Sequence, residues 1–363
     1  MPRTAPPTAA PPTAAPAAGP AAQPAAAPAA RGGPGRERRD DIDLLRVVCT
    51  AAVVLVHASA EFLDAGHRTT GVLGDSAGRF AVPAFFAMAG WAALVGSPVR
   101  GDAQLLTRLG RILRPMAVWT AVHLLWQYLS GRQSPHEGLR DAAHALFGSV
   151  EPAFHLWYLY TYVPLLLLLG VAVLVLRRRA APRRSLLLLA AFAVAPAFAG
   201  DARTLTGLPL PSWDWSVSLY SLAYAVAGAA LLAARRRGPR ALWLAGTAAA
   251  LVALTVYQLT VRHPAAYGSA AVAASTFAVL GAVSRVRVPE GARAVLGRLS
   301  DASFGTYLVH LLFVTVLVGP VAEAVPHGIA APAALAVTAV AAAVLSFAVS
   351  VLWGRLGMRK WLG

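Results

Sequence analysis

The chain has 363 residues, of which 57% are hydrophobic and only 13% are charged. A soluble domain carries roughly 25% charged residues, so this chain cannot cover a globular surface with polar groups and needs lipid as its solvent. The net charge of +16 would suggest a nucleic-acid partner in a soluble protein, but the basic residues form short clusters between apolar runs. We therefore assign this charge to orientation in a membrane and expect no nucleic-acid partner.

Residues 1–36 consist almost entirely of Ala, Pro, Gly and Thr. Such a segment cannot bury enough apolar surface to offset the entropy of ordering it, so we expect a disordered cytoplasmic tail. It lacks the apolar core of a cleaved signal peptide, and we expect the first apolar helix to be retained.

The rest of the chain predicts an all-α integral membrane protein, a bundle of about ten transmembrane helices. Residues 37–357 form one membrane domain in this prediction, and residues 358–363 form a short cytoplasmic tail. Ten apolar segments are long enough to cross, or nearly cross, a hydrocarbon core of ~30 Å. They are centred on residues 42–62, 79–97, 112–130, 155–176, 185–200, 214–234, 241–261, 266–284, 303–319 and 330–353.

The basic residues alternate with these segments. If the N-terminus is cytoplasmic, all but six of the 32 Lys and Arg residues fall in cytoplasmic segments. This bias follows the positive-inside rule and predicts that both ends of the chain are cytoplasmic. The six exceptions are Arg68, Arg79, Arg132, Arg140, Arg203 and Arg262.

The first apolar helix carries a polar stripe. At 100° per residue, Arg46 and His57 differ by about 20° around the helix axis and by about 16 Å along it. Asp43, Thr50 and Glu61 share this face. Ionisable groups in a span are costly if they face lipid, so the stripe must face the bundle interior or a water-filled cavity. Arg46 and Glu61 also fit interfacial charges, whereas His57 is a candidate general base.

Two features follow in the second and third segments. Pro83 and Gly90 indicate a kink or a close helix approach in the second segment, and a cavity-shaping role is the alternative to plain packing. Arg108, Arg111 and Arg114 stand at i, i+3 and i+6 and lie broadly on one side of a helix. Arginine suits phosphate recognition, although ordinary positive-inside charge also explains these three residues.

Two further clusters open later helices. Residues 155–162, which include Trp157, fit an aromatic belt at the interface, and stacking on a sugar is the alternative. Ser303, Tyr307 and His310 share one helical face by their spacing. A polar cavity and a structural hydrogen bond between helices both explain His310.

Several chemistries find no support in the sequence. The single cysteine, Cys49, excludes an internal disulfide and a cysteine metal cluster. The sequence has no phosphate-binding loop, no dinucleotide fingerprint and no hydrolase or zinc-protease motif. We therefore expect no bound metal or cofactor.

Five motifs together resemble the acyltransferase-3 family of bacterial membrane O-acyltransferases. The first is Asp43-Leu-Leu-Arg46 followed by ten residues and His57. The others are the Val82–Gly90 run, with Ala89 where the family usually has serine, the Arg108–Pro115 stretch, His155-Leu-Trp157-Tyr158-Leu and Ser303-Phe-Gly-Thr-Tyr307-Leu-Val-His310. The resemblance spans about residues 39–320 and makes residues 37–357 an acyltransferase domain.

The resemblance implies a bacterial cell-membrane enzyme that moves an acyl group, commonly acetyl, from cytoplasmic acyl-CoA to a hydroxyl of a sugar, a glycan or a glycosylated metabolite. Arg46 and His57 match the family's essential pair, and we expect them to be catalytic. The partners are then acyl-CoA, the acceptor and the bilayer. Candidate substrate-binding residues are Asp43, Glu61, Arg108, Arg111, Arg114, Trp157, Tyr307 and His310.

Two other function classes compete with this interpretation. A transporter or flippase could use the charged stripe as a proton relay, but the sequence shows no clear inverted repeat. A membrane scaffold without catalysis would explain neither His57 nor His310. For the enzyme, His57 acting as general base and His57 carrying the acyl group covalently both fit the sequence.

Overall fold

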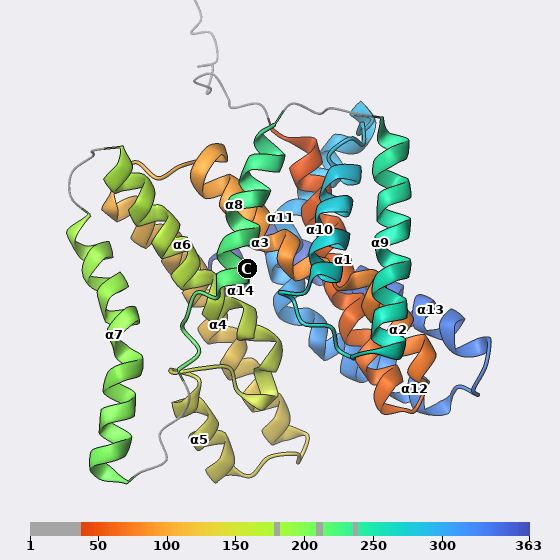
Figure 1. The fold of residues 1–363 in the computed structure, drawn as a ribbon. Helices are drawn as coiled ribbons and strands as arrows, with labels where there is room; N and C mark the ends of the chain where they lie inside the picture. The colour runs from red at the N-terminus through yellow and green to blue at the C-terminus, as the bar shows by residue number, and fades with distance from the viewer. Residues whose placement is uncertain (1–37, 178–181, 208–212, 235–238) are drawn as a thin grey trace, which may run out of the picture. The chain divides into compact units, whose positions relative to one another are not determined.

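The structure is a computed structural model that describes residues 38–177, 182–207, 213–234 and 239–363 (Figure 1). Contacts divide the chain into residues 1–38 and a compact unit from Arg39 to Gly363. The predicted disordered tail lies outside the described residues. Every regular element of the described residues is helical, which confirms the predicted all-α class.

The first half of the compact unit contains six α-helices. A π-helical turn at Ala92–Gly96 extends α3, and a 3₁₀-helix at Glu151–Leu156 leads into α6. The helices are α1 (Asp40–Asp64), α2 (Arg68–Gly78), α3 (Ala81–Trp91), α4 (Asp102–Leu129), α5 (Pro135–His144) and α6 (Trp157–Leu176).

The second half contains eight more helices. A π-helical turn at Val314–Val318 joins α11 to α12. The helices are α7 (Arg183–Thr206), α8 (Leu219–Ala233), α9 (Arg240–Thr260), α10 (Ala270–Val283), α11 (Glu290–Phe313), α12 (Gly319–Ala324), α13 (Ala330–Arg355) and α14 (Arg359–Leu362).

Seven helical stretches of the described chain are long and apolar enough to cross a membrane. Several such stretches in one chain are typical of a multi-pass membrane protein. The predicted sixth and eighth spans correspond to the shorter apolar helices α8 and α10, and the third corresponds to α4. The count of ten spans and the cytoplasmic placement of both ends stay predictions.

Helix α1 packs against α2, α3, α11 and α13, so its polar stripe faces other helices. The predicted close helix approach is found where α3 meets α8. A Cβ atom on Gly90 would lie 1.9 Å from the Ala225 carbonyl oxygen, and one on Gly228 would lie 2.1 Å from Cβ of Ala87. Small residues at these two positions therefore allow the backbones to touch.

The connection from α9 to α10 folds back into the bundle. Near the end of α9, the Leu259 carbonyl accepts a hydrogen bond from Arg68 at the start of α2. Further along, the carbonyls of Ala265 and Tyr267 accept hydrogen bonds from Arg79 and Tyr224. Residues 261–269 thus reach the junction of α2 and α3, which explains why α10 is short.

Helix α7 lies at the edge of the bundle, beside α6 and α4 (Figure 1). Ser185 is the only buried residue of this 24-residue helix. Its first turn is tied to the first turn of α4, because the Asp102 carboxylate accepts hydrogen bonds from the hydroxyl and amide of Ser185 and from the Arg184 amide. The exposed apolar remainder of α7 is suited to contact lipid.

Candidate active site

A cavity of about 530 Å³ opens between α1, α3, α4, α6 and α11. Its size falls within the range of sites that enclose small ligands. Arg46 and Arg111 provide positive charge on its wall, Asp301 provides one negative charge, and much of the remaining wall is apolar, with Val82 and Phe85 among its residues. We call this cavity the Arg46 pocket.

Arg46 is held at the pocket by its own helix. Its Nη1 lies 3.6 Å from Oδ1 of Asp43, while 42% of its side chain remains exposed and free to contact a ligand. Asp43 is buried and accepts a 2.6 Å hydrogen bond from the Ser300 hydroxyl of α11. Asp43 therefore joins α1 to α11 and orients Arg46, and it does not line the pocket itself.

The three arginines of α4 have different surroundings. Arg111 lines the pocket. Arg108 is half-buried and acts electrostatically, as Arg46 does, on the hydroxyl of Tyr162 in the pocket wall. Arg114 is exposed on the same helix and is not among the lining residues.

Four histidines from four elements gather beside this pocket. They are His57 of α1, His123 of α4, His155 of the 3₁₀-helix and His310 of α11. The ring centroids of His57 and His310 are 5.0 Å apart, those of His155 and His310 are 5.4 Å apart, and those of His123 and His155 are 4.7 Å apart. His57 is half-buried, whereas the other three are buried. We call this group the histidine cluster.

Backbone groups hold part of the cluster and leave other nitrogens unpaired. His310 Nδ1 lies 2.5 Å from the Tyr307 carbonyl oxygen, and His123 Nε2 lies 3.3 Å from that of Leu308. Among the described residues, neither ring nitrogen of His155 nor Nε2 of His310 has a hydrogen-bond partner. Buried unpaired nitrogens carry a desolvation cost that a hydrogen-bonding partner would relieve.

Tyr307 connects the Arg46 pocket with the histidine cluster. Its ring lines the pocket, and its hydroxyl donates a 2.5 Å hydrogen bond to the His155 carbonyl. Its ring centroid is 5.7 Å from that of His155 and 5.9 Å from that of His310. Tyr307 thus belongs both to the wall of the Arg46 pocket and to the surroundings of the histidine cluster.

Glu61 stands beyond the cluster, at the other end of α1 from Arg46. It lies one helical turn, about 6 Å, beyond His57 and interacts electrostatically with Asp64, Arg132 and Glu323. Glu61 is therefore not a wall of the Arg46 pocket, and its role in binding stays a prediction.

Trp157 lies outside the Arg46 pocket and stacks on Tyr267, with ring centroids 5.5 Å apart and planes inclined by 26°. The Arg79 guanidinium carbon lies 4.9 Å from the centroid of the same Tyr267 ring. Trp157 is thus packed against the segment that folds back between α9 and α10.

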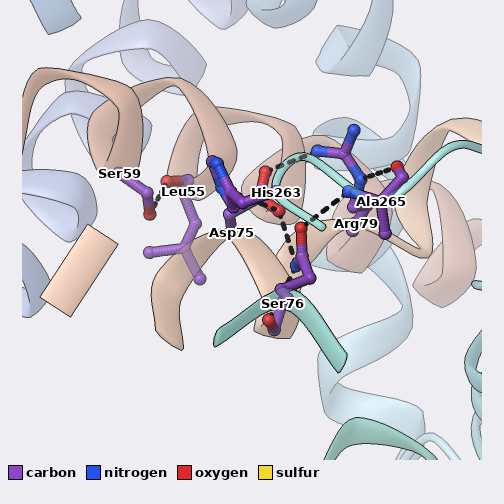
Figure 2. A network of polar contacts seen from close by, with 8 residues as sticks. Leu55, Ser59, Asp75, Ser76, Arg79, His263 and Ala265 are labelled. Carbon is purple, nitrogen blue, oxygen red and sulfur yellow. Dashed lines mark hydrogen bonds and ion pairs between the residues drawn. The ribbon is translucent and has the colours of Figure 1, made fainter. Parts of the chain in front are cut away.

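A buried polar network fixes that segment (Figure 2). Arg79 pairs with Asp75 at 2.7 Å and donates a 2.6 Å hydrogen bond to the Ala265 carbonyl. Gln258 donates to Asp75 and to Ser76, each at 2.8 Å, and accepts from the Ala265 amide at 2.9 Å. Because its members satisfy one another, the network fits a structural role.

The sequence anticipated His57 and His310 but not the other two members of the cluster. His155 belongs to the segment 155–162 around Trp157, which the sequence predicts to be an aromatic belt. His123 is an ionisable residue within the apolar third segment, and the same feature in the first segment identified His57. That signal could have identified His123, but no local pattern indicates that the four histidines meet.

The match to a family model agrees with this geometry. The model of the acyltransferase-3 family, described as an acyltransferase domain, matches residues 39–354. The helical bundle with its buried polar site is therefore that of a multi-pass membrane acyltransferase. The chain belongs to the acyltransferase-3 family, as its five motifs predicted. Neither the curated proteins nor the solved structures contain a significant match to the chain.

Within the described residues, no group of three or more His, Cys, Asp or Glu side chains is arranged to hold a metal ion. The rings of the histidine cluster instead contact one another edge-on or tilted.

Proposed function

We propose that the protein is a membrane O-acyltransferase that moves an acyl group from acyl-CoA to a hydroxyl of a sugar, a glycan or a glycosylated metabolite. The observation that carries the proposal is the position of Tyr307 between the Arg46 pocket and the histidine cluster. A cationic pocket that leads to buried imidazoles supplies both a donor site and a proton acceptor in a member of an acyltransferase family.

In this proposal the donor occupies the Arg46 pocket. Arg46 and Arg111 bind donor phosphates through charge-assisted hydrogen bonds, while exposed Arg114 contacts phosphates at the pocket mouth. The apolar wall accommodates the thioester arm, which points along Tyr307. The axial separation of about 16 Å between Arg46 and His57 favours donor binding over charge stabilisation at the reacting carbonyl as the role of Arg46.

Transfer then takes place at His57. In direct transfer, the imidazole removes the proton of the acceptor hydroxyl while the oxygen attacks the thioester carbonyl. The C–S bond breaks, CoA leaves as a thiolate, and the imidazolium returns the proton to it. In the covalent route, the imidazole nitrogen attacks the thioester carbonyl, the C–S bond breaks and CoA leaves as a thiolate. The acceptor oxygen then attacks the acyl carbon, the C–N bond to the imidazole breaks, and the hydroxyl proton passes to the released imidazole.

A purified-protein assay tests the donor side of the proposal. The full chain is reconstituted in proteoliposomes and supplied with acetyl-CoA carrying a labelled acetyl group. We expect labelled acetyl groups to appear on added methyl glycosides, or as slow hydrolysis in their absence. A flux driven by a pH gradient, without any consumption of acetyl-CoA, would contradict the proposal and indicate a transporter.

The route through His57 can be resolved in the same preparation. Incubation with labelled acetyl-CoA and no acceptor, followed by rapid acid quenching, traps any acyl-enzyme. Label that remains on wild-type protein but not on His57→Ala supports the covalent route. Full transfer activity without trapped label supports direct transfer.

A further inference from the structure

A second cavity lies at the opposite end of α1 from the Arg46 pocket. It has a volume of about 260 Å³ and is formed by the C-terminal end of α4, by α5 and by the start of the 3₁₀-helix. Its lining is mainly polar, in contrast to the wall of the Arg46 pocket. The residues used below are Arg132, Gln133, Glu137, Arg140, Asp141 and Glu151. We call this cavity the α5 pocket.

The pocket is built on a fixed frame. Ser134 and Glu137 form a reciprocal capping box at the start of α5. At the other end of the helix, the carbonyls of Ala145 and Leu146 accept hydrogen bonds from Tyr160 and Trp215. Because both ends of α5 are anchored, the pocket wall is preorganised for a ligand.

Several polar groups of the pocket are available to a ligand. Among the described residues, Arg132, Arg140 and Glu151 form no side-chain hydrogen bond or ion pair. Gln133 donates a 2.6 Å hydrogen bond to Asp141, but its buried Oε1 has no partner. Because this oxygen is buried, a ligand hydroxyl can donate to it only after the Gln133 side chain turns toward the cavity.

The charge of the pocket selects among ligand classes. Two arginines face three carboxylates, which gives a net charge of −1. This balance disfavours a phosphate group and hence the CoA donor. Guanidinium, carboxylate and amide groups that converge on a small polar cavity match the donor and acceptor pattern of a neutral polyhydroxyl group.

The α5 pocket is connected with the histidine cluster. Glu151 begins the 3₁₀-helix that carries His155 and Phe154, and the Phe154 ring centroid lies 5.4 Å from that of His57. Arg132 interacts electrostatically with Glu61, which stands one turn beyond His57. The α5 pocket and the histidine cluster thus share the 3₁₀-helix, which begins at Glu151 in the pocket wall and places Phe154 beside His57.

We propose that the α5 pocket binds a sugar unit of the acceptor, so that donor and acceptor reach His57 from opposite ends of α1. This inference rests on the proposed function and deepens it. It assigns Arg132, Gln133 and Glu151 to acceptor binding and gives Glu61 a place on the path from the pocket to His57.

The test combines a binding measurement with a kinetic one on the full chain in lipid nanodiscs. Saturation-transfer NMR measures binding of methyl glucoside, methyl galactoside and methyl rhamnoside to wild-type protein and to a Gln133→Ala/Glu151→Gln variant. Leu139→Ala, exposed on α5 outside the pocket, and Asp201→Asn, an exposed carboxylate of α7, are the controls. Acetyl-CoA turnover is measured in parallel.

We expect wild-type protein and both controls to bind at least one glycoside. The double variant should lose this binding or show a KM for the acceptor raised about tenfold or more, because one hydrogen-bonding side chain is removed and a carboxylate acceptor is replaced by a neutral amide. The KM for acetyl-CoA should be unchanged. Absence of glycoside binding in the wild type, an unchanged double variant, or a preference for glucose 6-phosphate would overturn the assignment. Loss of acetyl-CoA turnover in the wild type would instead refute the proposed function.

Discussion

At the scale of single residues, Asp43 and Arg46 belong to the same polar stripe but have different structural roles. Asp43 is buried and bound to Ser300, whereas Arg46 keeps much of its guanidinium exposed at the pocket. The stripe was predictable from a period of 3.6 residues. The different roles of Asp43 and Arg46 were not predictable from the sequence, because they depend on which helix packs against each residue.

Replacement of Arg46 tests its assignment to the donor. We expect Arg46→Ala to raise the KM for acetyl-CoA by about thirtyfold, because a charge-assisted hydrogen bond contributes roughly 2 kcal/mol. Arg46→Lys should recover only part of the loss, since lysine retains the charge but not the bidentate fork. The measurement is steady-state kinetics, and Arg287→Ala, at an exposed basic residue, is the control. A wild-type KM for acetyl-CoA in Arg46→Ala would contradict the assignment.

At the scale of elements, the fold-back segment between α9 and α10 depends on a buried ion pair. Removal of one partner leaves the other charge uncompensated, which typically costs about 3–5 kcal/mol. We therefore expect Arg79→Ala to lower the unfolding temperature in detergent strongly. Arg68→Ala is the matched control, because Arg68 is exposed and makes one long hydrogen bond of 3.4 Å to the Leu259 carbonyl.

A second variant distinguishes loss of the pair from loss of an arginine. In Asp75→Asn/Arg79→Gln both charges are removed together, so the free energy of unfolding should recover part of its wild-type value. Equal melting temperatures for Arg79→Ala and Arg68→Ala would show that the network does not hold the fold-back segment.

The attachment of α7 to α4 should depend on pH. The hydrogen bond from the Ser185 hydroxyl is the main cause that lowers the pKa of Asp102 below its usual value, and the amides of Ser185 and Arg184 add to it. A depressed folded-state pKa contributes stability above the unfolded value, and this contribution is lost as pH falls through the folded value.

We therefore expect the first turn of α7 to loosen in acid and in Asp102→Ala at neutral pH. Hydrogen exchange of the Arg184 and Ser185 amides, corrected for intrinsic rates, provides the measurement. Asp301→Ala, a half-exposed carboxylate on α11, serves as the control. Unchanged protection in Asp102→Ala would show that the apolar contacts of α7 suffice.

At the scale of the whole molecule, hydropathy predicted more than local motifs did. Lipid imposes a minimum length on each apolar run, and the ten predicted segments coincide in order with ten helices. These helices are α1, α3, α4, α6, α7, α8, α9, α10, α11 and α13, whereas α2 was not predicted. The shortness of α8 and α10 and the fold-back at 261–269 were not predictable, since the fold-back segment is held by hydrogen bonds from the side chains of Arg79 and Tyr224, which are distant in the sequence.

The site was predictable only in part. His57 was identified because an ionisable group in an apolar helix is costly, and His310 was placed on a polar face by its spacing. Their approach to 5.0 Å, and the addition of His123 and His155, arise from the packing of four separate elements. The periodicity of a single helix cannot predict contacts between histidines from four different elements.

The orientation of the bundle can be tested with single cysteines. Cys49 is buried, so its replacement by serine gives a background without accessible thiols. We expect Leu139→Cys on α5 to react with a membrane-impermeant maleimide in intact cells. Gly291→Cys, at the start of α11, should react only after the cells are permeabilised. The opposite labelling pattern would invert the predicted topology.

The most direct test of the central claim is the rate of labelled acetyl transfer from acetyl-CoA by purified His57→Ala protein in nanodiscs. Folding is verified by its melting temperature, and His327→Ala, an exposed histidine, is the control. We predict that His57→Ala reduces transfer at least a hundredfold, the lower range for loss of a general base, while His327→Ala retains wild-type activity. Full transfer by folded His57→Ala protein would contradict a mechanism that operates at the histidine cluster.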